Sequence, residues 1–123
     1  MFALLVHHHW AGLILEGIKT WEIRGSRTAR RGPIALLVPR EHLLVGTCEL
    51  VDVQGPLSRA MLLSSTHLHY IPPGRLAGLP YATPYAWVLA RARPLAKPLP
   101  YRPPRGAIRW VRLPGAIASQ LEA

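Results

Sequence analysis

Lys19, Glu22 and Arg24 are the residues whose types and spacing best suit chemistry in this sequence. The segment TWEIR, residues 20–24, alternates and is rich in β-forming residues, so it predicts a strand with Glu22 and Arg24 on one face. An acid and a base on one face can orient each other, and a lysine beside them can act as a base or a nucleophile. In the alternative interpretation, Glu22 and Arg24 form an exposed ion pair that contributes less than about 1 kcal/mol to stability, and Lys19 is solvated.

The opposite face of the same strand is apolar. Trp21 and Ile23 alternate with the charged residues, so we expect them to enter the core and to fix the register of the strand. Gly17 follows a stretch with apolar residues at helical spacing, which is typical of the residue just past a helix end. The sequence therefore predicts a helix end and a turn that present Lys19 next to the strand.

An arginine-rich loop, GSRTARRG, follows at residues 25–32. Guanidinium groups bind phosphate in a bidentate manner, hydroxyl side chains add donors, and glycine lets backbone amides approach a ligand. We therefore predict that Arg27, Arg30 and Arg31 form a phosphate-binding rim. The alternative is a solvated basic loop. The loop is not a Walker motif and lacks G-x-G-x-x-G, so a nucleotide-binding fold of that kind is not indicated.

The distribution of charge favours a polyanionic partner. The 123-residue chain has 15 Lys and Arg against 6 Asp and Glu, a net charge of +9 with histidine neutral. No acid lies between Asp52 and Glu122, whereas nine basic residues do. A positive half of this kind indicates nucleic acid as the simplest partner. The competing explanation is the composition of a thermophile or a GC-rich genome, because the chain has 13 Pro, 13 Arg and no Asn.

Two sets of histidines are candidate metal ligands. His7, His8 and His9 are consecutive, and His67 and His69 are two residues apart. The sequence contains no H-E-x-x-H motif and only one cysteine, so we expect neither a metal nor another cofactor. We expect the triplet to lie at the polar end of a strand that lines a cleft.

Cysteine and aromatic residues offer weaker alternatives. Cys48 is inside an apolar strand pattern, where a thiol is usually an inert packing residue. Tyr85, Trp87 and Trp110 are large enough to stack on nucleobases, but their positions in predicted strands favour the core.

The elements that must position these residues follow from hydrophobic periodicity. Strands are predicted over residues 2–6, 20–24, 34–38, 43–53, 85–92 and 106–113, and helices over 10–17 and 57–63. Gly46 marks a bulge or a close approach. We predict a loop over 67–83, a segment over 94–104 too rich in proline for a central strand, and a frayed tail.

This pattern indicates one domain over residues 1–123 of the α+β class, a small mixed β-barrel with one or two helices. No apolar run reaches the ~18 residues that a membrane span needs, and the N-terminus lacks the features of a signal peptide. A single cysteine fits a reducing compartment, so we expect a cytoplasmic protein.

The segment WAGLILEGIKTWEIRG, residues 10–25, resembles the signature of the ASCH domain family, which belongs to the PUA-like superfamily. Its Gly-x-Lys-x-x-Glu-x-Arg turn is the most specific part, and four further segments follow in the expected order: RGPIALLV (31–38), VGTCELVDV (45–53), YAWVL (85–89) and GAIRWV (106–111). The resemblance implies a pseudo-barrel of about five or six strands with helices between them. It also implies RNA binding, with Lys19, Glu22 and Arg24 lining a cleft near Gly17.

A branch of this superfamily hydrolyses acylated cytidine with a lysine, a threonine and a glutamate, and the sequence departs from that pattern. Lys19 matches the lysine, but Glu22 holds the position of the threonine, and no acid lies between Val53 and Leu121 to match the glutamate. Many relatives carry Arg-Gln-Pro-like residues at the end of the first strand, where this chain has its histidine triplet. Another acid, Glu22 or Glu49, would have to serve in such a reaction.

RNA or a nucleotide-like molecule is therefore the ligand that we expect first. The predicted contact residues share positive charge or a place on the cleft: Lys19, Glu22, Arg24, Arg27, Arg30 and Arg31. The alternative is a hydrolase that acts on N-acylated cytidine or on RNA, with Lys19 and Glu22 as catalytic residues. A third reading, a protein-interaction adaptor, would leave the cleft residues dispensable.

Overall fold

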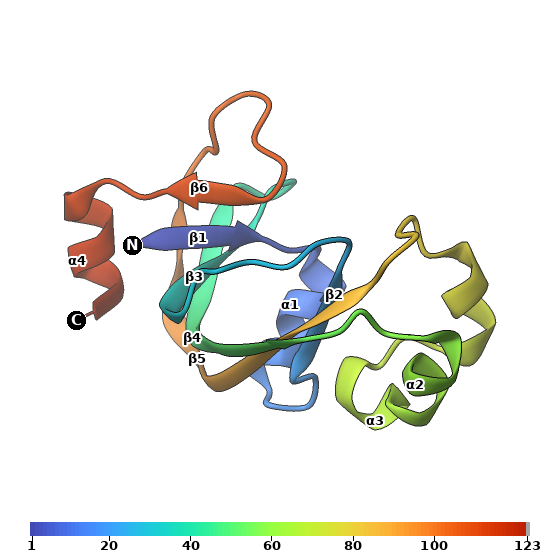
Figure 1. Ribbon diagram of the computed structural model, residues 1–123. Coiled ribbons are helices and arrows are strands. Elements are labelled where there is room, and N and C mark those ends of the chain that lie inside the picture. The colour runs from blue at the N-terminus through green and yellow to red at the C-terminus, as the bar shows by residue number, and fades with distance from the viewer. Residues whose placement is uncertain (123) are drawn as a thin grey trace.

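Six apolar segments pair into one mixed sheet in the computed structural model, which describes residues 1–122 (Figure 1). The strands are β1 (Phe2–Leu5), β2 (Trp21–Arg24), β3 (Gly32–Val38), β4 (Leu43–Gln54), β5 (Tyr85–Pro100) and β6 (Trp110–Arg112). They lie in the order β2-β5-β4-β3-β1-β6, with β1 and β3 parallel and all other neighbours antiparallel. The long strands β4 and β5 curl the sheet into a half-barrel. The predicted α+β fold with a small mixed barrel is confirmed.

The helices gather at two ends of the sheet and inside its curve. They are α1 (His8–Leu15), α2 (Arg59–Ser64), α3 (Thr66–His69), the 3-10 helix η1 (Pro73–Gly78) and α4 (Gly115–Glu122). The short helices α2 and α3 lie beyond β2, whereas α4 lies at the far end beside the start of β1 (Figure 1). None of the helices formed by residues 1–122 is both long and apolar enough to cross a membrane.

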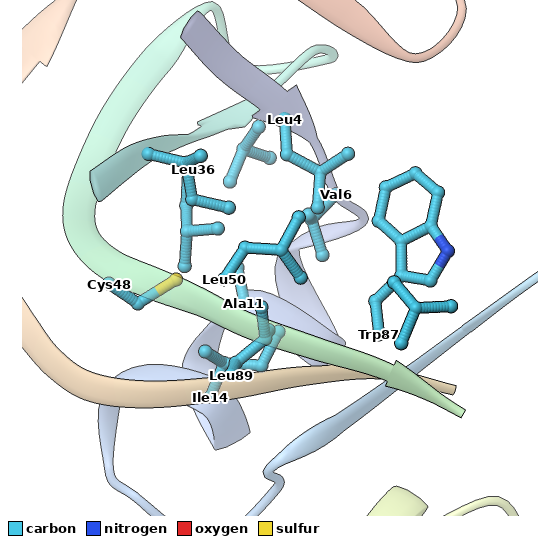
Figure 2. Close-up of a cluster of buried hydrophobic side chains, with 12 residues drawn as sticks. Leu4, Val6, Ala11, Ile14, Leu36, Cys48, Leu50, Trp87 and Leu89 are labelled. Atoms are coloured by element: carbon cyan, nitrogen blue, oxygen red, sulfur yellow. The ribbon is translucent and has the colours of Figure 1, made fainter. Parts of the chain in front are cut away.

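The main core fills the concave side of the sheet and is closed by α1. The buried residues Ala11 and Ile14 of α1 belong to the same cluster as Leu36 of β3, Leu50 of β4 and Trp87 of β5 (Figure 2). Burial of apolar side chains is the main favourable term in folding, so this cluster fixes α1 against the sheet. The turn after α1 is thereby held in one place.

Close packing between α1 and the sheet depends on Gly46 of β4. A Cβ atom at this position would lie 2.4 Å from Leu15 Cδ2 and 2.6 Å from the carbonyl oxygen of Arg93. The β4–β5 register also shifts between Leu44 and Gly46. The predicted bulge or close approach at Gly46 is confirmed, and both features occur together.

Two sequence-based predictions for the second half of the chain are wrong. The segment 67–83 is not only a loop, because it contains the end of α3 and all of η1. The proline-rich segment is the second half of β5, in which Pro94 pairs with Gly46 and Pro100 with Leu43. The prolines are tolerated because this half of β5 pairs with β4 alone, and a proline needs only to avoid the hydrogen-bonded side.

The C-terminal tail also differs from the frayed end that we expected. Residues 115–122 form α4, and Leu121 is buried with Ala3, Leu5 and Leu37 in a second apolar cluster. Apolar contact with β1 and β3 therefore fixes this segment. The sequence of the tail alone does not show that β1 and β3 offer it an apolar surface.

Candidate functional site

The turn after α1 presents Lys19 to the interior of the molecule. Gly17 has a φ of +77°, a conformation that favours glycine, and it lies just past the end of α1, as predicted. The backbone amide of Lys19 then donates to the carbonyl of Leu13, and the amide of Thr20 donates to the carbonyl of Leu68. These two bonds lock the turn between α1 and α3.

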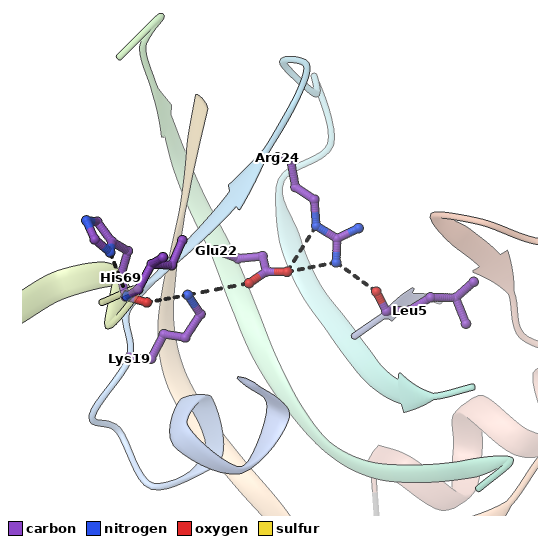
Figure 3. Close-up of polar contacts among 6 residues, drawn as sticks. Leu5, Lys19, Glu22, Arg24 and His69 are labelled. Atoms are coloured by element: carbon purple, nitrogen blue, oxygen red, sulfur yellow. Dashed lines mark hydrogen bonds and ion pairs between the residues drawn. The ribbon is translucent and has the colours of Figure 1, made fainter. Parts of the chain in front are cut away.

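The Lys19 side chain is buried, with only 2% of its surface exposed. Its ammonium donates a hydrogen bond of 2.6 Å to the backbone carbonyl of His69 and lies 3.6 Å from Glu22 Oε1 (Figure 3). The same ammonium lies 4.6 Å from the centre of a Trp10 ring, close enough for a cation–π contact. A buried lysine with three fixed neighbours is not the solvated side chain of the alternative interpretation.

Glu22 lies between two cations. Arg24 donates from Nε at 3.0 Å and from Nη2 at 2.8 Å to the same oxygen, Glu22 Oε2, and Arg24 Nη2 also donates to the carbonyl of Leu5 at 2.7 Å (Figure 3). Glu22 is 6% exposed, so the alternative interpretation, in which Glu22 and Arg24 form an exposed pair, is wrong. The other oxygen, Oε1, accepts no hydrogen bond from residues 1–122 and faces Lys19.

The buried environment changes the protonation chemistry of Lys19. Burial lowers the pKa of its ammonium from the usual value of 10.5, the Glu22 carboxylate opposes this change, and the charge of Arg24 adds to it. A lysine with a lowered pKa reaches its neutral, nucleophilic form at a lower pH than an exposed lysine. The same ammonium remains a hydrogen-bond donor whenever it is protonated.

A cavity of about 700 Å³ opens onto these three residues. The volume lies within the ~300–1,000 Å³ typical of small-molecule sites. Lys19, Glu22 and Arg24 line it together with Trp10 of α1 and Tyr81, which precedes β5. We call this cavity, with its lining residues, the cleft. It combines aromatic rings, three cations (Lys19, Arg24 and Arg75) and a carboxylate in one concave surface.

The histidine triplet lies at the start of α1 rather than on a strand. His7 is the N-cap residue, its Nδ1 accepts from the amide of His9 at 3.3 Å, and His8 and His9 form the first turn. Only His7 lines the cleft. Among residues 1–122, no three histidine, cysteine, aspartate or glutamate side chains are grouped as a metal site requires.

The arginines of the predicted rim do not line the cleft. Arg27 donates to the carbonyl of Gly55 at 3.3 Å, and Arg31 donates to backbone carbonyls of its own loop. Arg30 stacks on Phe2, with 3.5 Å between its guanidinium carbon and the ring centre, and lies 4.8 Å from the Trp110 ring. The structure brings Lys19, Glu22 and Arg24 together and leaves the other three arginines outside the cleft, with Arg27 and Arg31 exposed and Arg30 half-buried.

Two of the remaining candidates, Trp87 and Cys48, belong to the core. Trp87 is fully buried, donates from Nε1 to the carbonyl of Ser26 at 2.9 Å and stacks on Trp110 at 5.7 Å between ring centres. Cys48 is also buried, and this burial raises the pKa of its thiol to about 12. Neither Trp87 nor Cys48 is available to a ligand from solvent.

Three features of the cleft were not predicted from the sequence. Arg75 and Tyr81 lie in the segment 67–83, for which the sequence predicts a loop, and the contact of His69 with Lys19 is made by a backbone carbonyl. Lys19 and His69 are 50 residues apart, so no local pattern joins them. The prolines at 72, 73 and 80 were the only signal that this segment is stiff enough to form a wall.

Comparison with known proteins identifies related chains. The model of the ASCH domain family matches residues 4–99. The crystal structure of the ASCH protein from Zymomonas mobilis has a similar fold, with a TM-score of 0.77, 15% sequence identity and coverage of 98% of this chain and 92% of that chain. Two point mutants of that protein give TM-scores of 0.75 and 0.74 at 17% identity, covering 98% of this chain and 95% and 93% of theirs. No curated protein sequence matches this chain.

Proposed function

Because this chain belongs to the ASCH domain family, we propose that it binds RNA, or a nucleotide derived from it, through the cleft lined by Lys19, Glu22 and Arg24. One observation carries the proposal: a buried carboxylate is held between two cations at the wall of a cavity, and one of its oxygens, Glu22 Oε1, has only the Lys19 ammonium beside it, at 3.6 Å. A carboxylate oxygen has more than one acceptor site, so Glu22 Oε1 can accept a hydrogen bond from a base amino group beside Lys19.

A purely structural role explains this cluster poorly. Burying charged groups costs several kcal/mol per ion, and well-packed apolar residues of similar volume are often at least as stable. Lys19 and Glu22 are nevertheless among the few buried charged residues of the chain, and both face a cavity. Perturbed titratable groups in a cavity are typical of functional sites.

The cleft offers the two kinds of contact by which proteins recognise unpaired bases. Trp10 and Tyr81 provide aromatic surfaces for stacking, and Glu22 provides an acceptor for a base edge. We assign the phosphate contacts of a longer RNA to the surface arginines Arg27 and Arg31, with Arg30 beside them. We also propose a cytoplasmic location, which the single free thiol of Cys48 favours.

The direct test is the affinity of the protein for fluorescein-labelled single-stranded RNA, measured by fluorescence anisotropy between about 25 and 200 mM salt. Each phosphate contact on a single strand contributes about −0.7 to the slope of log K against log salt, so three arginine contacts predict a slope near −2. Lys19→Ala should weaken binding, whereas Lys97→Ala, which changes the other lysine of the chain, should not. Undetectable binding at the lowest salt would refute the proposal.

A second candidate function, hydrolysis of N-acylated cytidine or of RNA, is favoured by the lowered pKa of Lys19. In that reaction the neutral amine of Lys19 would act as base or nucleophile, and Glu22 would carry the proton. Among residues 1–122, Glu22 is the only carboxylate that lines the cleft, so it would have to serve both the lysine and the leaving group. Turnover of N-acylated nucleosides that disappears in Lys19→Ala would support this activity, and a panel left intact would exclude it for those substrates.

A further inference from the structure

We infer that Arg75 forms a phosphate subsite at the mouth of the cleft, so that the ligand is a phosphorylated nucleotide or an RNA end rather than a free nucleoside. The inference rests on the function proposed above. It adds the chemical class of the ligand and a residue that binds it.

The first observation is that the Arg75 guanidinium has no hydrogen-bond or ion-pair partner within the part of the chain that the structure describes. Arg75 lies on η1, lines the same cavity as Lys19 and Arg24, and is exposed. No hydrogen bond or ion pair joins its side chain to any group in residues 1–122, whereas the guanidinium of Arg24 has partners on Glu22 and Leu5. Arg75 therefore has all five N–H donors free for a ligand.

The second observation is that the backbone beneath Arg75 is fixed. Its amide donates to the carbonyl of Pro72 at 2.8 Å, and η1 begins with Pro73. The neighbouring residues Ile71 and Leu76 are both buried in the apolar cluster that also holds Ile23 of β2. Since the segment is anchored on both sides of Arg75, little backbone entropy is lost when a ligand binds there.

The third observation is the charge of the cleft. Its lining includes three cations, Lys19, Arg24 and Arg75, and one carboxylate, Glu22, so its net charge is +2 when His7 is neutral. No acid between Val53 and Leu121 is available to compensate this charge. The dianion of a phosphate monoester would neutralise it, and its oxygens match the fork of a guanidinium.

Burial separates the roles of the two ends of the cleft. Lys19 and Glu22 are buried, at 2% and 6% exposure, whereas Arg75 is exposed. A ligand that places its uncharged base against the buried residues and its charged phosphate near Arg75 avoids the cost of burying the phosphate. Gly74 and Gly78 leave space beside Arg75, because a Cβ atom at either position would meet nothing within 4 Å.

The experiment compares four nucleosides with their 5′- and 3′-monophosphates by isothermal titration calorimetry at low salt. For the preferred base, the wild-type protein should bind one of the monophosphates at least about tenfold more tightly than the nucleoside, a difference of about 1.4 kcal/mol. Arg75→Gln should abolish this preference and leave the nucleoside affinity within a factor of two. Arg105→Gln, at an exposed arginine that does not line the cleft, should behave as the wild type.

The possible results distinguish failure of the Arg75 phosphate subsite from failure of the proposed binding function. The phosphate subsite is refuted if the wild-type protein binds nucleosides and both monophosphates with equal affinity. It is also refuted if Arg75→Gln weakens the binding of nucleosides and of monophosphates to the same extent. In both cases the proposed binding function stands. If the wild-type protein binds neither RNA nor any nucleotide at low salt, the proposed function itself fails. Unchanged circular dichroism of Arg75→Gln shows that the loss is local.

Discussion

Glu22 is the residue on which the polar cluster of the cleft depends, because it faces both Lys19 and Arg24. Glu22→Gln leaves two cations side by side with no counter-charge, and the lysine is buried. Removal of one partner from a buried ion pair costs about 3 kcal/mol. Urea unfolding should show a decrease in the free energy of unfolding of this size.

Glu49→Gln is the matched control for that substitution. Glu49 pairs with Arg91 on the surface, where solvent screens the interaction, so its loss should change stability much less. Equal effects of the two substitutions would show that the cluster around Glu22 is solvated and would contradict the structure.

His69 makes the stability of the cleft wall depend on pH. Its ring accepts from the amide of Ile71 at Nδ1 (2.9 Å), so the proton of the neutral ring lies on Nε2, which donates to the carbonyl of Leu62 at 2.7 Å. Burial lowers the pKa of His69 from 6.5, the bond to Leu62 opposes this, and the charges of Lys19 and His67 add to it.

The sign of the effect follows from proton binding. Because the folded-state pKa is lowered, the unfolded chain takes up a proton first as pH falls below 6.5. The free energy of unfolding should therefore decrease from pH 7 towards pH 5, by at most about 1.4 kcal/mol per pH unit for this site. His69→Gln should remove this dependence, and His67→Gln, at an exposed neighbour, should retain it. A profile that His69→Gln leaves unchanged would assign the effect to another group.

At the scale of elements, the contact between α1 and β4 decides where the turn with Lys19 lies. Gly46→Ala would place a methyl group against Leu15 and the backbone of Arg93, and the backbone cannot yield easily. Overpacking of this kind costs about 2 kcal/mol, and the displaced helix should also weaken RNA binding. Gly12→Ala, on the open side of α1, should instead raise stability by about 0.5–1 kcal/mol. Thermal unfolding of both variants measures these changes. An unchanged melting temperature of Gly46→Ala would show that α1 is loosely packed on β4.

Elements with a strong local signal were predictable from the sequence. The alternating burial of β4 matches its period-2 pattern, and Ser58 caps α2 by accepting from the amide of Met61, near the start of the helix predicted over 57–63. The four residues of α3 and the six of η1 are too short for a 3.6-residue period, and prolines conceal the latter. The prediction of the fold class depends on the strands, so it is correct although α3 and η1 were missed.

In the cleft too, features with a local sequence signal were predictable and features set by tertiary contacts were not. The proximity of Glu22 and Arg24 follows from alternation along one strand, which the sequence contains. The burial of Lys19 depends on a carbonyl 50 residues away, and the position of Arg75 depends on how η1 packs on β2. Such contacts join residues that are distant in the chain, so no local pattern in a single sequence predicts them.

At the scale of the whole molecule, the central claim is that RNA enters the cleft and does not merely coat a basic surface. A net charge of +9 alone attracts any polyanion, so the affinity and salt dependence of the wild-type protein do not by themselves separate the two. The indole signals of the tryptophans can separate these two modes of binding, because Trp10 lines the cleft whereas Trp87 is buried in the core.

The most direct measurement is an NMR titration of the ¹⁵N-labelled protein with a short single-stranded RNA. We predict that the Trp10 indole signal and the backbone amides of residues 19–24, 74–79 and 81 shift together and saturate, while the Trp87 indole is unaffected. Shifts confined to residues 27–31 and the remaining basic surface, with no change at Trp10 or at residues 19–24, would contradict the assignment of the cleft as the binding site.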